Sequence, residues 1–219
     1  MRRLYLVRHG HTIWNDTGGV AGRTDIALSD KGRDAVAQLG LSLLEHCPIG
    51  SWICSPMKRT RESSSILRIS ELTEIGRSIF PAEQFDARLV ELNFGDWEGM
   101  TWSQVHEQYS VKMNEWGQDW VNRAPPNGET FLEQAHRCND WLTSWIAQTQ
   151  IAPGDVASSS QSALLVIHGG SIRALVCNCL GWPLERAMSF RVDPASLCVL
   201  QQKVPSGPWH VRLLNSRHF

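Results

Sequence analysis

The fold is indicated by the stretch Ala163-Leu164-Leu165-Val166-Ile167-His168-Gly169-Gly170. Five consecutive apolar residues that end at a polar residue and two glycines are typical of a strand buried on both faces. We predict that a helix follows from Ile172 to Leu180. A buried strand that leads into a helix is the repeating unit of parallel α/β sheets.

The start of the chain has the same order of elements. Leu4-Tyr5-Leu6-Val7 is a short apolar strand, and Arg8-His9-Gly10 follows it directly. Further strands are expected at 52–54, 196–202 and 209–214, and helices after Ser29, over 59–69 and after the capping box Thr130-x-x-Glu133. This order predicts an α/β fold with three α/β/α layers around a mostly parallel, doubly wound sheet.

Charged residues follow two of the predicted strands at the edge where such sheets bind ligands. Ligands lie beyond the carboxyl ends of the strands. Arg8-His9-Gly10 and His168-Gly169-Gly170 both lie there. Residues 100–128, rich in tryptophan and loop signals, are expected to form a small cap over this edge. We therefore predict a single domain, 1–219, with its site beneath the cap.

The composition argues against several classes of function. The chain has 219 residues, of which 42% are hydrophobic and 20% charged, which suits one globular domain. A formal net charge of -1 leaves no basic stripe for nucleic acid and no polybasic patch for a membrane. The first apolar stretch ends after four residues, at Arg8, and is too short for a signal peptide. We expect a cytoplasmic protein whose cationic site is local.

The cysteines and histidines do not indicate a metal site. The six cysteines have no C-x-x-C spacing and are predicted to be reduced, buried thiols. His9-x-His11 can also be interpreted as a metal pair, but the ligands that would complete such a site are not evident. We predict no metal and no cofactor. The Ser-rich stretch Val156 to Ser162 is expected to be a surface loop.

Arg8-His9-Gly10 has the residue types that phosphoryl transfer requires. A neutral imidazole nitrogen is a competent nucleophile toward phosphorus. The neighbouring arginine offers a planar fork for phosphate oxygens. Taken alone, the tripeptide is more often a strand end that carries a solvated arginine and a capping histidine.

Five segments in chain order resemble the signature of the histidine phosphatase (phosphoglycerate mutase-like) superfamily. They are residues 6–15, 22–32, 55–60, 89–99 and 166–173, and they span most of residues 4–175. Each segment lies at a predicted strand end or in a loop. The resemblance implies a phosphatase that forms a phosphohistidine, acts on a small-molecule phosphate ester and has the α/β fold expected above.

The resemblance also implies a role for each matching residue. His9 would accept the phosphate, and Glu91 would protonate the leaving oxygen and then activate water. The expected phosphate ligands are Arg8, Arg59 and His168, with Asn15 and the backbone N–H of Gly169 as further donors. The other expected substrate-binding residues are Arg23, Thr24 and Trp97. Fixed cationic donors can stabilise the charge of a transferring phosphoryl group, so no metal is required.

Two positions depart from the family pattern, and single residues have simpler interpretations. His11 stands where the family commonly has Glu or Gln, and this difference is expected to affect substrate selectivity more than catalytic competence. Ser63 stands where Thr is common. Alone, Arg59 could be a solvated helix residue, Glu91 a surface carboxylate and His168 a core histidine. Arg23 remains open between a substrate contact and a solvated side chain.

Residues 116–131 resemble the cap segment of α-ribazole phosphatases, as do 190–193 and 213–217 less strongly. This resemblance implies α-ribazole 5′-phosphate, from cobalamin biosynthesis, as the substrate. Its dimethylbenzimidazole ring needs apolar or stacking walls. The candidates are Trp97, Trp102, Trp116 and Trp120, although Trp116 and Trp120 at i, i+4 spacing would also suit simple helix packing.

Two other classes of function remain open. One is a broad-specificity sugar-phosphate phosphatase or a phosphoglycerate mutase, which would use the same chemistry. The other is a catalytically dead binding module, although the complete set of expected catalytic residues argues against it. The sequence does not decide the oligomeric state and leaves a homodimer open.

Overall fold

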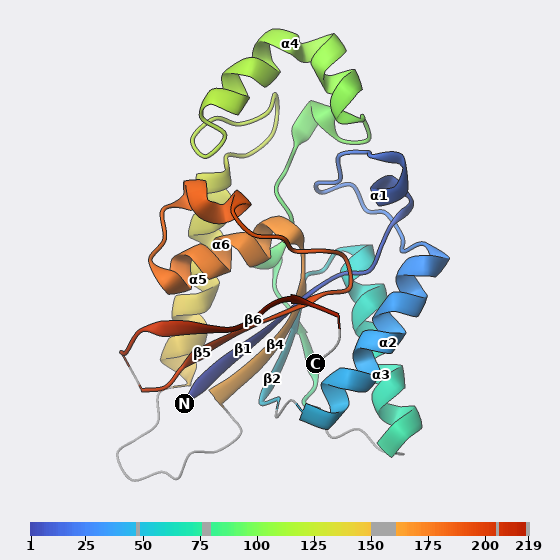
Figure 1. Ribbon diagram of the computed structural model, residues 1–219, viewed down its shortest axis with the longest axis vertical. Helices are drawn as coiled ribbons and strands as arrows, with labels where there is room; N and C mark the ends of the chain where they lie inside the picture. Colours follow the sequence, from blue (N-terminus) through green and yellow to red (C-terminus); the bar gives the residue numbers. More distant parts are fainter. Residues whose placement is uncertain (47–48, 76–79, 150–160, 205, 218–219) are drawn as a thin grey trace.

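A mixed six-stranded sheet forms the centre of the protein (Figure 1). The computed structural model describes residues 1–46, 49–75, 80–149, 161–204 and 206–217. The strands are β1 (Arg2–Arg8), β2 (Ser51–Cys54), β3 (Glu83–Phe85), β4 (Ser162–Ile167), β5 (Leu197–Gln202) and β6 (Trp209–Ser216). In the order β3-β2-β4-β1-β5-β6, the first four are parallel and the last two form an antiparallel edge. The predicted mostly parallel α/β sheet is confirmed.

Helices cover both faces of the sheet, as predicted for three layers. The helices α2 (Asp30–His46) and α3 (Lys58–Ile75) pack on one face, with Tyr5 and Val7 of β1 in their core. The helices α5 (Phe131–Gln148) and α6 (Gly169–Leu180) pack on the other face, against Leu4 and Leu6. Successive strand residues point to opposite faces, so one strand contributes to both cores.

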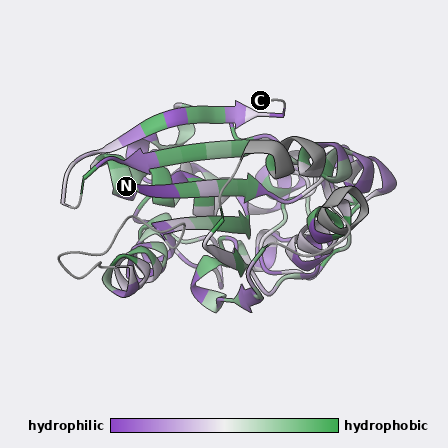
Figure 2. Ribbon diagram, turned by 90° about the horizontal axis from the view of Figure 1, so that it is seen from below, coloured by the Kyte–Doolittle hydropathy of each residue, from purple (hydrophilic) through white to green (hydrophobic). Residues whose placement is uncertain are grey.

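The inner strands β1, β2, β4 and β5 are mostly buried because they are covered on both sides, whereas the edge strands β3 and β6 are partly exposed and carry hydrophilic residues (Figure 2). All six residues of β4 are buried. The five described cysteines are free and buried, and burial raises the pKa of the Cys138 thiol to about 12. Cys47 lies outside the described residues, as do positions 156–160 of the expected Ser-rich loop. Ser162 is not in a loop but begins β4.

The helix α6 begins earlier than predicted. It starts at Gly169, with His168 as its N-cap, so both glycines are helical rather than part of a turn. The start of this helix packs closely, because a side chain on Gly170 would overlap Glu91 Oε1. The first N–H groups of α6, which have no partner within the helix, therefore lie beside functional residues.

The predicted cap region is mainly the kinked helix α4 (Trp102–Gln118), which begins at a capping box between Thr101 and Gln104 and is interrupted at Tyr109, where the backbone is not helical. In Figure 1 this helix lies at the end of the molecule to which the parallel strands point. Smaller elements are α1 (Ile13–Thr17), η1 (Ala87–Leu89), η2 (Gly95–Trp97) and η4 (Leu184–Met188). That residues 100–128 act as a cap remains a prediction.

Three further sequence-based predictions concern the start of α5, membrane-spanning helices and cellular location. Thr130 caps α5, and its hydroxyl and the Glu133 carboxylate form the expected capping box. None of the described helices is both long and apolar enough to cross a membrane. A cytoplasmic location remains a prediction.

Candidate active site

Two histidines meet where β1 and β4 end. Arg8 pairs with Ile167 in the parallel register, so His9 and His168 follow neighbouring strand ends. The backbone N–H of His9 donates to the backbone carbonyl of Ile167 at 3.0 Å. The ring centroids of the two histidines lie 5.3 Å apart. Both side chains are buried, with 4% of His9 and none of His168 exposed.

The hydrogen bonds of His9 define which ring nitrogen is reactive. Nδ1 lies 2.7 Å from the Gly10 carbonyl oxygen. A carbonyl can only accept, so Nδ1 carries the proton and Nε2 has the free lone pair. Burial, then Arg59 and Arg8, hold the pKa of His9 well below its usual value. His9 is therefore a neutral imidazole with an available nucleophilic nitrogen.

His168 is placed to donate a hydrogen bond to a ligand. Its Nε2 lies 2.8 Å from the Ser55 hydroxyl oxygen, and its buried Nδ1 has no partner among the described residues. Burial and Arg59 lower the pKa of His168 well below its usual value. In the tautomer in which the Ser55 hydroxyl donates to Nε2, the proton of the neutral ring lies on Nδ1, where a phosphate oxygen could accept it.

Two buried guanidinium groups are held by backbone carbonyls. Arg59 is fully buried and donates to the carbonyls of Thr24 at 3.0 Å and Gly22 at 2.6 Å. Arg8 donates to the Val192 carbonyl at 2.6 Å. Burial lowers the pKa of Arg8 to about 10, so it stays charged at neutral pH. The Nε atoms of both have no partner among the described residues, which leaves each a donor for a ligand.

The carboxylate of Glu91 lies at the start of α6. It accepts from the backbone N–H groups of Leu92 at 2.9 Å and Gly170 at 3.2 Å, and from Gln134 Nε2 at 3.1 Å. Glu91 is also the largest electrostatic influence that favours the charged forms of Arg8 and Arg59. The predicted acid therefore lies in the same site as the predicted phosphate ligands.

Arg173, to which the sequence analysis assigned no role, belongs to this cluster. Its Nη1 would lie 3.2 Å from a side-chain carbon added to Gly169, and Arg8 Nε would lie 3.5 Å from the same point. Its buried Nε likewise has no partner among the described residues. The spacing Gly169 to Arg173, one helical turn in a segment already matched to the family, was the signal available in the sequence.

Ser55 and Gln134 were also missed as parts of the site, and Ser63 was noted only as a departure from the family pattern. Ser63 accepts from the Gly10 N–H at 3.1 Å and donates to the Arg59 carbonyl at 2.7 Å, so it links the nucleophile segment to α3. All three are fully buried. A single Ser or Gln in a sequence carries no signal of this kind, since such residues are common on surfaces.

The expected substrate loop lies beside Arg59, but its polar groups are already engaged. Glu98 accepts from the backbone N–H groups of Arg23 and Thr24, both at 2.7 Å, and from the Thr24 hydroxyl. The Arg23 guanidinium pairs with Glu129 at 3.2 Å. Asn15 Oδ1 accepts from Thr12 N–H at 2.9 Å, so its carbonyl caps α1 and its amide nitrogen remains the candidate donor.

The tryptophans divide into buried and exposed members. Trp97 is fully buried against Trp116 and Trp102, at centroid distances of 5.6 and 6.3 Å, which argues against its predicted contact with a substrate. The reason is that α4 needs an apolar core of its own. Trp102 is 41% exposed and stacks on Trp116. Trp120 lies beyond the end of α4 and packs on Phe131, so Trp116 and Trp120 do not share a helix.

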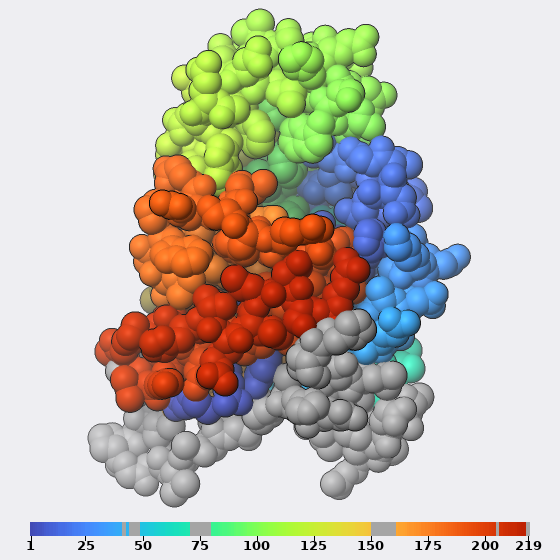
Figure 3. All heavy atoms as spheres, viewed as in Figure 1, coloured from blue at the N-terminus to red at the C-terminus, as the bar shows by residue number. Residues whose placement is uncertain are grey.

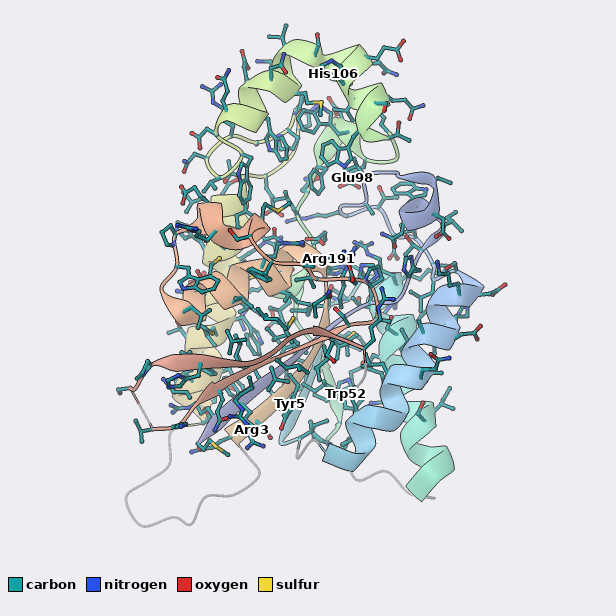
Figure 4. The ribbon with its side chains drawn as sticks, in the orientation of Figure 1. Arg3, Tyr5, Trp52, Glu98, His106 and Arg191 are labelled. Carbon is teal, nitrogen blue, oxygen red and sulfur yellow. The ribbon has the colours of Figure 1, made fainter. Side chains whose placement is uncertain are left out.

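The molecular surface is hollowed between α4, α1 and the segment that contains η4 (Figure 3). Figure 4 places Glu98 on the side of α4 that faces the sheet, and Arg191 between α4 and the strands. His106 lies on α4 itself and is exposed.

His11 lies 3.8 Å from the Asp16 carboxylate, and no metal-binding group of three or more His, Cys, Asp or Glu residues occurs in the described ranges.

The chain resembles known phosphatases over nearly its whole length. Residues 4–217 match the model of the histidine phosphatase superfamily, branch 1. The adenosylcobalamin/α-ribazole phosphatase of Salmonella typhimurium is 29% identical over 98% of this chain and 96% of that protein. The glucosyl-3-phosphoglycerate phosphatase of Mycolicibacterium vanbaalenii is 31% identical, covering 84% and 77% of the two chains. The crystal structure of the α-ribazole phosphatase from Shigella flexneri superposes with a TM-score of 0.80, at 25% identity over 99% and 97% of the chains.

Proposed function

Because this chain belongs to the histidine phosphatase superfamily, branch 1, and is a phosphatase of that family, we propose that it hydrolyses phosphate monoesters through a phosphohistidine at His9. The observation that carries the proposal is the free Nε2 of a buried, neutral His9. Around it lie Arg8, Arg59 and His168, each with a buried nitrogen that has no partner among the described residues.

In the first step, His9 Nε2 attacks phosphorus and the bond from phosphorus to the ester oxygen breaks. The electron pair of that bond goes to the leaving oxygen, which takes a proton from Glu91. The charge on the three remaining phosphoryl oxygens is stabilised by the guanidinium groups and by His168. The bond from His9 Nδ1 to the Gly10 carbonyl stabilises the positive charge that develops on the phosphorylated ring.

In the second step, water attacks phosphorus on the phosphohistidine. The Glu91 carboxylate accepts a proton from this water, the bond between phosphorus and Nε2 breaks, and the electron pair returns to His9. Inorganic phosphate leaves, and both side chains regain their starting protonation states. One carboxyl group thus acts first as an acid and then as a base.

We further propose α-ribazole 5′-phosphate as the substrate. Relatives that carry this name match nearly the full length of the chain. Trp102 supports the proposal, since this residue of the predicted cap is 41% exposed and would offer aromatic surface to a flat base. Trp102→Ala should raise KM for α-ribazole 5′-phosphate and leave KM for ribose 5-phosphate unchanged. An equal change for both would remove Trp102 from the binding surface.

A direct comparison of phosphate esters tests the function. The full chain is incubated with α-ribazole 5′-phosphate, p-nitrophenyl phosphate, and 3-phosphoglycerate with a trace of the bisphosphate. We expect release of inorganic phosphate, with the highest kcat/KM for α-ribazole 5′-phosphate, and no turnover by His9→Ala. Isomerisation of 3-phosphoglycerate would indicate a mutase instead. Undiminished turnover by His9→Ala would rule out the phosphohistidine.

A further inference from the structure

Among the described residues, Gln134 is the side chain that hydrogen-bonds to the Glu91 carboxylate. It projects from α5, is fully buried, and donates from Nε2 to Glu91 Oε1 at 3.1 Å. The same nitrogen lies 3.2 Å from the Ser171 hydroxyl and 3.4 Å from the Val90 carbonyl. A buried amide in this position has no exposed surface to interact with solvent, so its interactions are with Glu91 and the adjoining backbone.

The two oxygens of Glu91 have different surroundings. Oε1 accepts from Leu92 N–H at 2.9 Å, from Gln134 at 3.1 Å and from Gly170 N–H at 3.2 Å. Oε2 accepts only the Gly170 N–H among the described residues, also at 3.2 Å and shared with Oε1. A carboxyl oxygen that bears the proton becomes a donor and a weaker acceptor. Protonating Oε1 would therefore weaken three hydrogen bonds. Protonating Oε2 would weaken only its share of the hydrogen bond from the Gly170 N–H, which Oε1 also accepts.

We propose that Gln134 is a positioning residue that makes Oε2 of Glu91 the oxygen that gives and takes the proton. This inference rests on the proposed function of Glu91 as acid and then base. Because Oε1 stays an acceptor in both protonation states, the carboxyl group does not rotate between the two steps. The same oxygen protonates the leaving group and later accepts the proton of the attacking water.

The packing around the pair supports this assignment. A side chain on Gly170 would overlap Glu91 Oε1 and would lie 2.8 Å from Gln134 Oε1, so the helix start closes the space on that side. The backbone of the segment is held separately, by Arg137, which donates to the carbonyls of Val90 at 2.7 Å and Glu91 at 3.0 Å. Removing the Gln134 amide therefore leaves the main chain of Glu91 anchored.

The test compares Gln134→Met with Ser171→Ala. Methionine keeps the length of the side chain and removes the donor. Ser171 is equally buried and accepts from Gln134, but no hydrogen bond joins it to the Glu91 carboxylate. The value of kcat/KM reports the first phosphoryl transfer alone, and it is measured for p-nitrophenyl phosphate and for a simple alkyl phosphate. Alkoxide leaves only with a proton, whereas p-nitrophenolate needs none.

We expect Gln134→Met to lower kcat/KM about tenfold or more for the alkyl phosphate and much less for p-nitrophenyl phosphate. Ser171→Ala should affect both esters equally. An equal loss for both esters in Gln134→Met, or no loss, would overturn the inference. If that variant does not fold, Gln134→Leu replaces it: leucine is also apolar and offers no donor to Oε1, so the same selective loss is expected. Failure of the proposed function would appear separately, as turnover by His9→Ala.

Discussion

Replacing Arg59 by methionine tests the electrostatic basis of the site. Its guanidinium is fully buried, donates to two backbone carbonyls and keeps an unpartnered Nε among the described residues. Methionine preserves the apolar stem of the side chain and removes every donor. The variant therefore loses one fixed cationic ligand of the transferring phosphoryl group. It also loses the positive charge that, among the neighbouring charges, lowers the pKa of His9 most.

The expected loss in turnover is large. Removing one preorganised donor to a developing charge typically costs about 2.7 to 4 kcal/mol, or roughly 100- to 1000-fold in kcat. The pH profile should move as well. After burial, Arg59 is the largest cause that lowers the pKa of His9, so this pKa rises toward its usual value in the variant. His9 attacks only when neutral, and the acid limb of kcat/KM therefore shifts to higher pH.

The assay is kcat/KM for p-nitrophenyl phosphate across the acid range, with Arg68→Met as the matched control. Arg68 lies on the same helix, away from the site, where its guanidinium stacks over Trp52 at 4.5 Å. We expect this control to keep wild-type turnover and an unshifted profile. A loss of less than about tenfold in Arg59→Met, or an acid limb that stays in place, would refute the electrostatic role.

Other predictions concern stability, packing and metals. The folded pKa values of His9 and His168 are lowered, so the unfolded chain binds more protons as the pH falls below the usual histidine value. The free energy of unfolding should then drop by up to about 1.4 kcal/mol per pH unit for each histidine; urea unfolding that is unchanged from about pH 7 to about pH 5 would contradict this. Arg137→Met breaks a partly buried pair with Glu129 at 2.6 Å and should cost about 3 kcal/mol of stability, which a shift in the urea midpoint measures. Gly170→Ala should keep the fold, as measured by circular dichroism. It should lower kcat/KM, because the new methyl group would displace the side-chain ends of Glu91 and Gln134. Activity should survive EDTA; a large loss would indicate a required metal.

Local patterns predicted most of the architecture, but not the three-residue, partly exposed strand β3 or the helix α4. The apolar runs at Leu4–Val7 and 163–167 are strands because a strand covered on both faces must be apolar throughout. Their histidines could be placed together in advance because parallel strands end at the same edge of a sheet. The capping box at Thr130 was also predictable, since it depends on residues only three positions apart.

Features that depend on long-range contacts were not predicted. The start of α6 was placed too late because glycines normally favour turns, whereas here Gly170 is needed for its close contact with Glu91 and Gly169 lies against Arg173 and Arg8. The burial of Trp97 likewise depends on how η2 meets α4. A tryptophan in an amphipathic region can face a ligand or a core, and spacing along the chain does not distinguish the two.

The amino-acid sequence by itself indicated the layers, five of the six described strands and the two histidine segments at the sheet edge, because hydrophobic periodicity and strand ends are properties of neighbouring residues. The family resemblance added Arg59 and Glu91 to the predicted site. The tertiary structure decided the chemistry of each atom: which nitrogen of His9 is free, which oxygen of Glu91 has the fewest donors, and that Arg173 and Gln134 join the site. Those properties arise from hydrogen bonds and burial between segments far apart in the chain, and a pattern of residue types does not contain them.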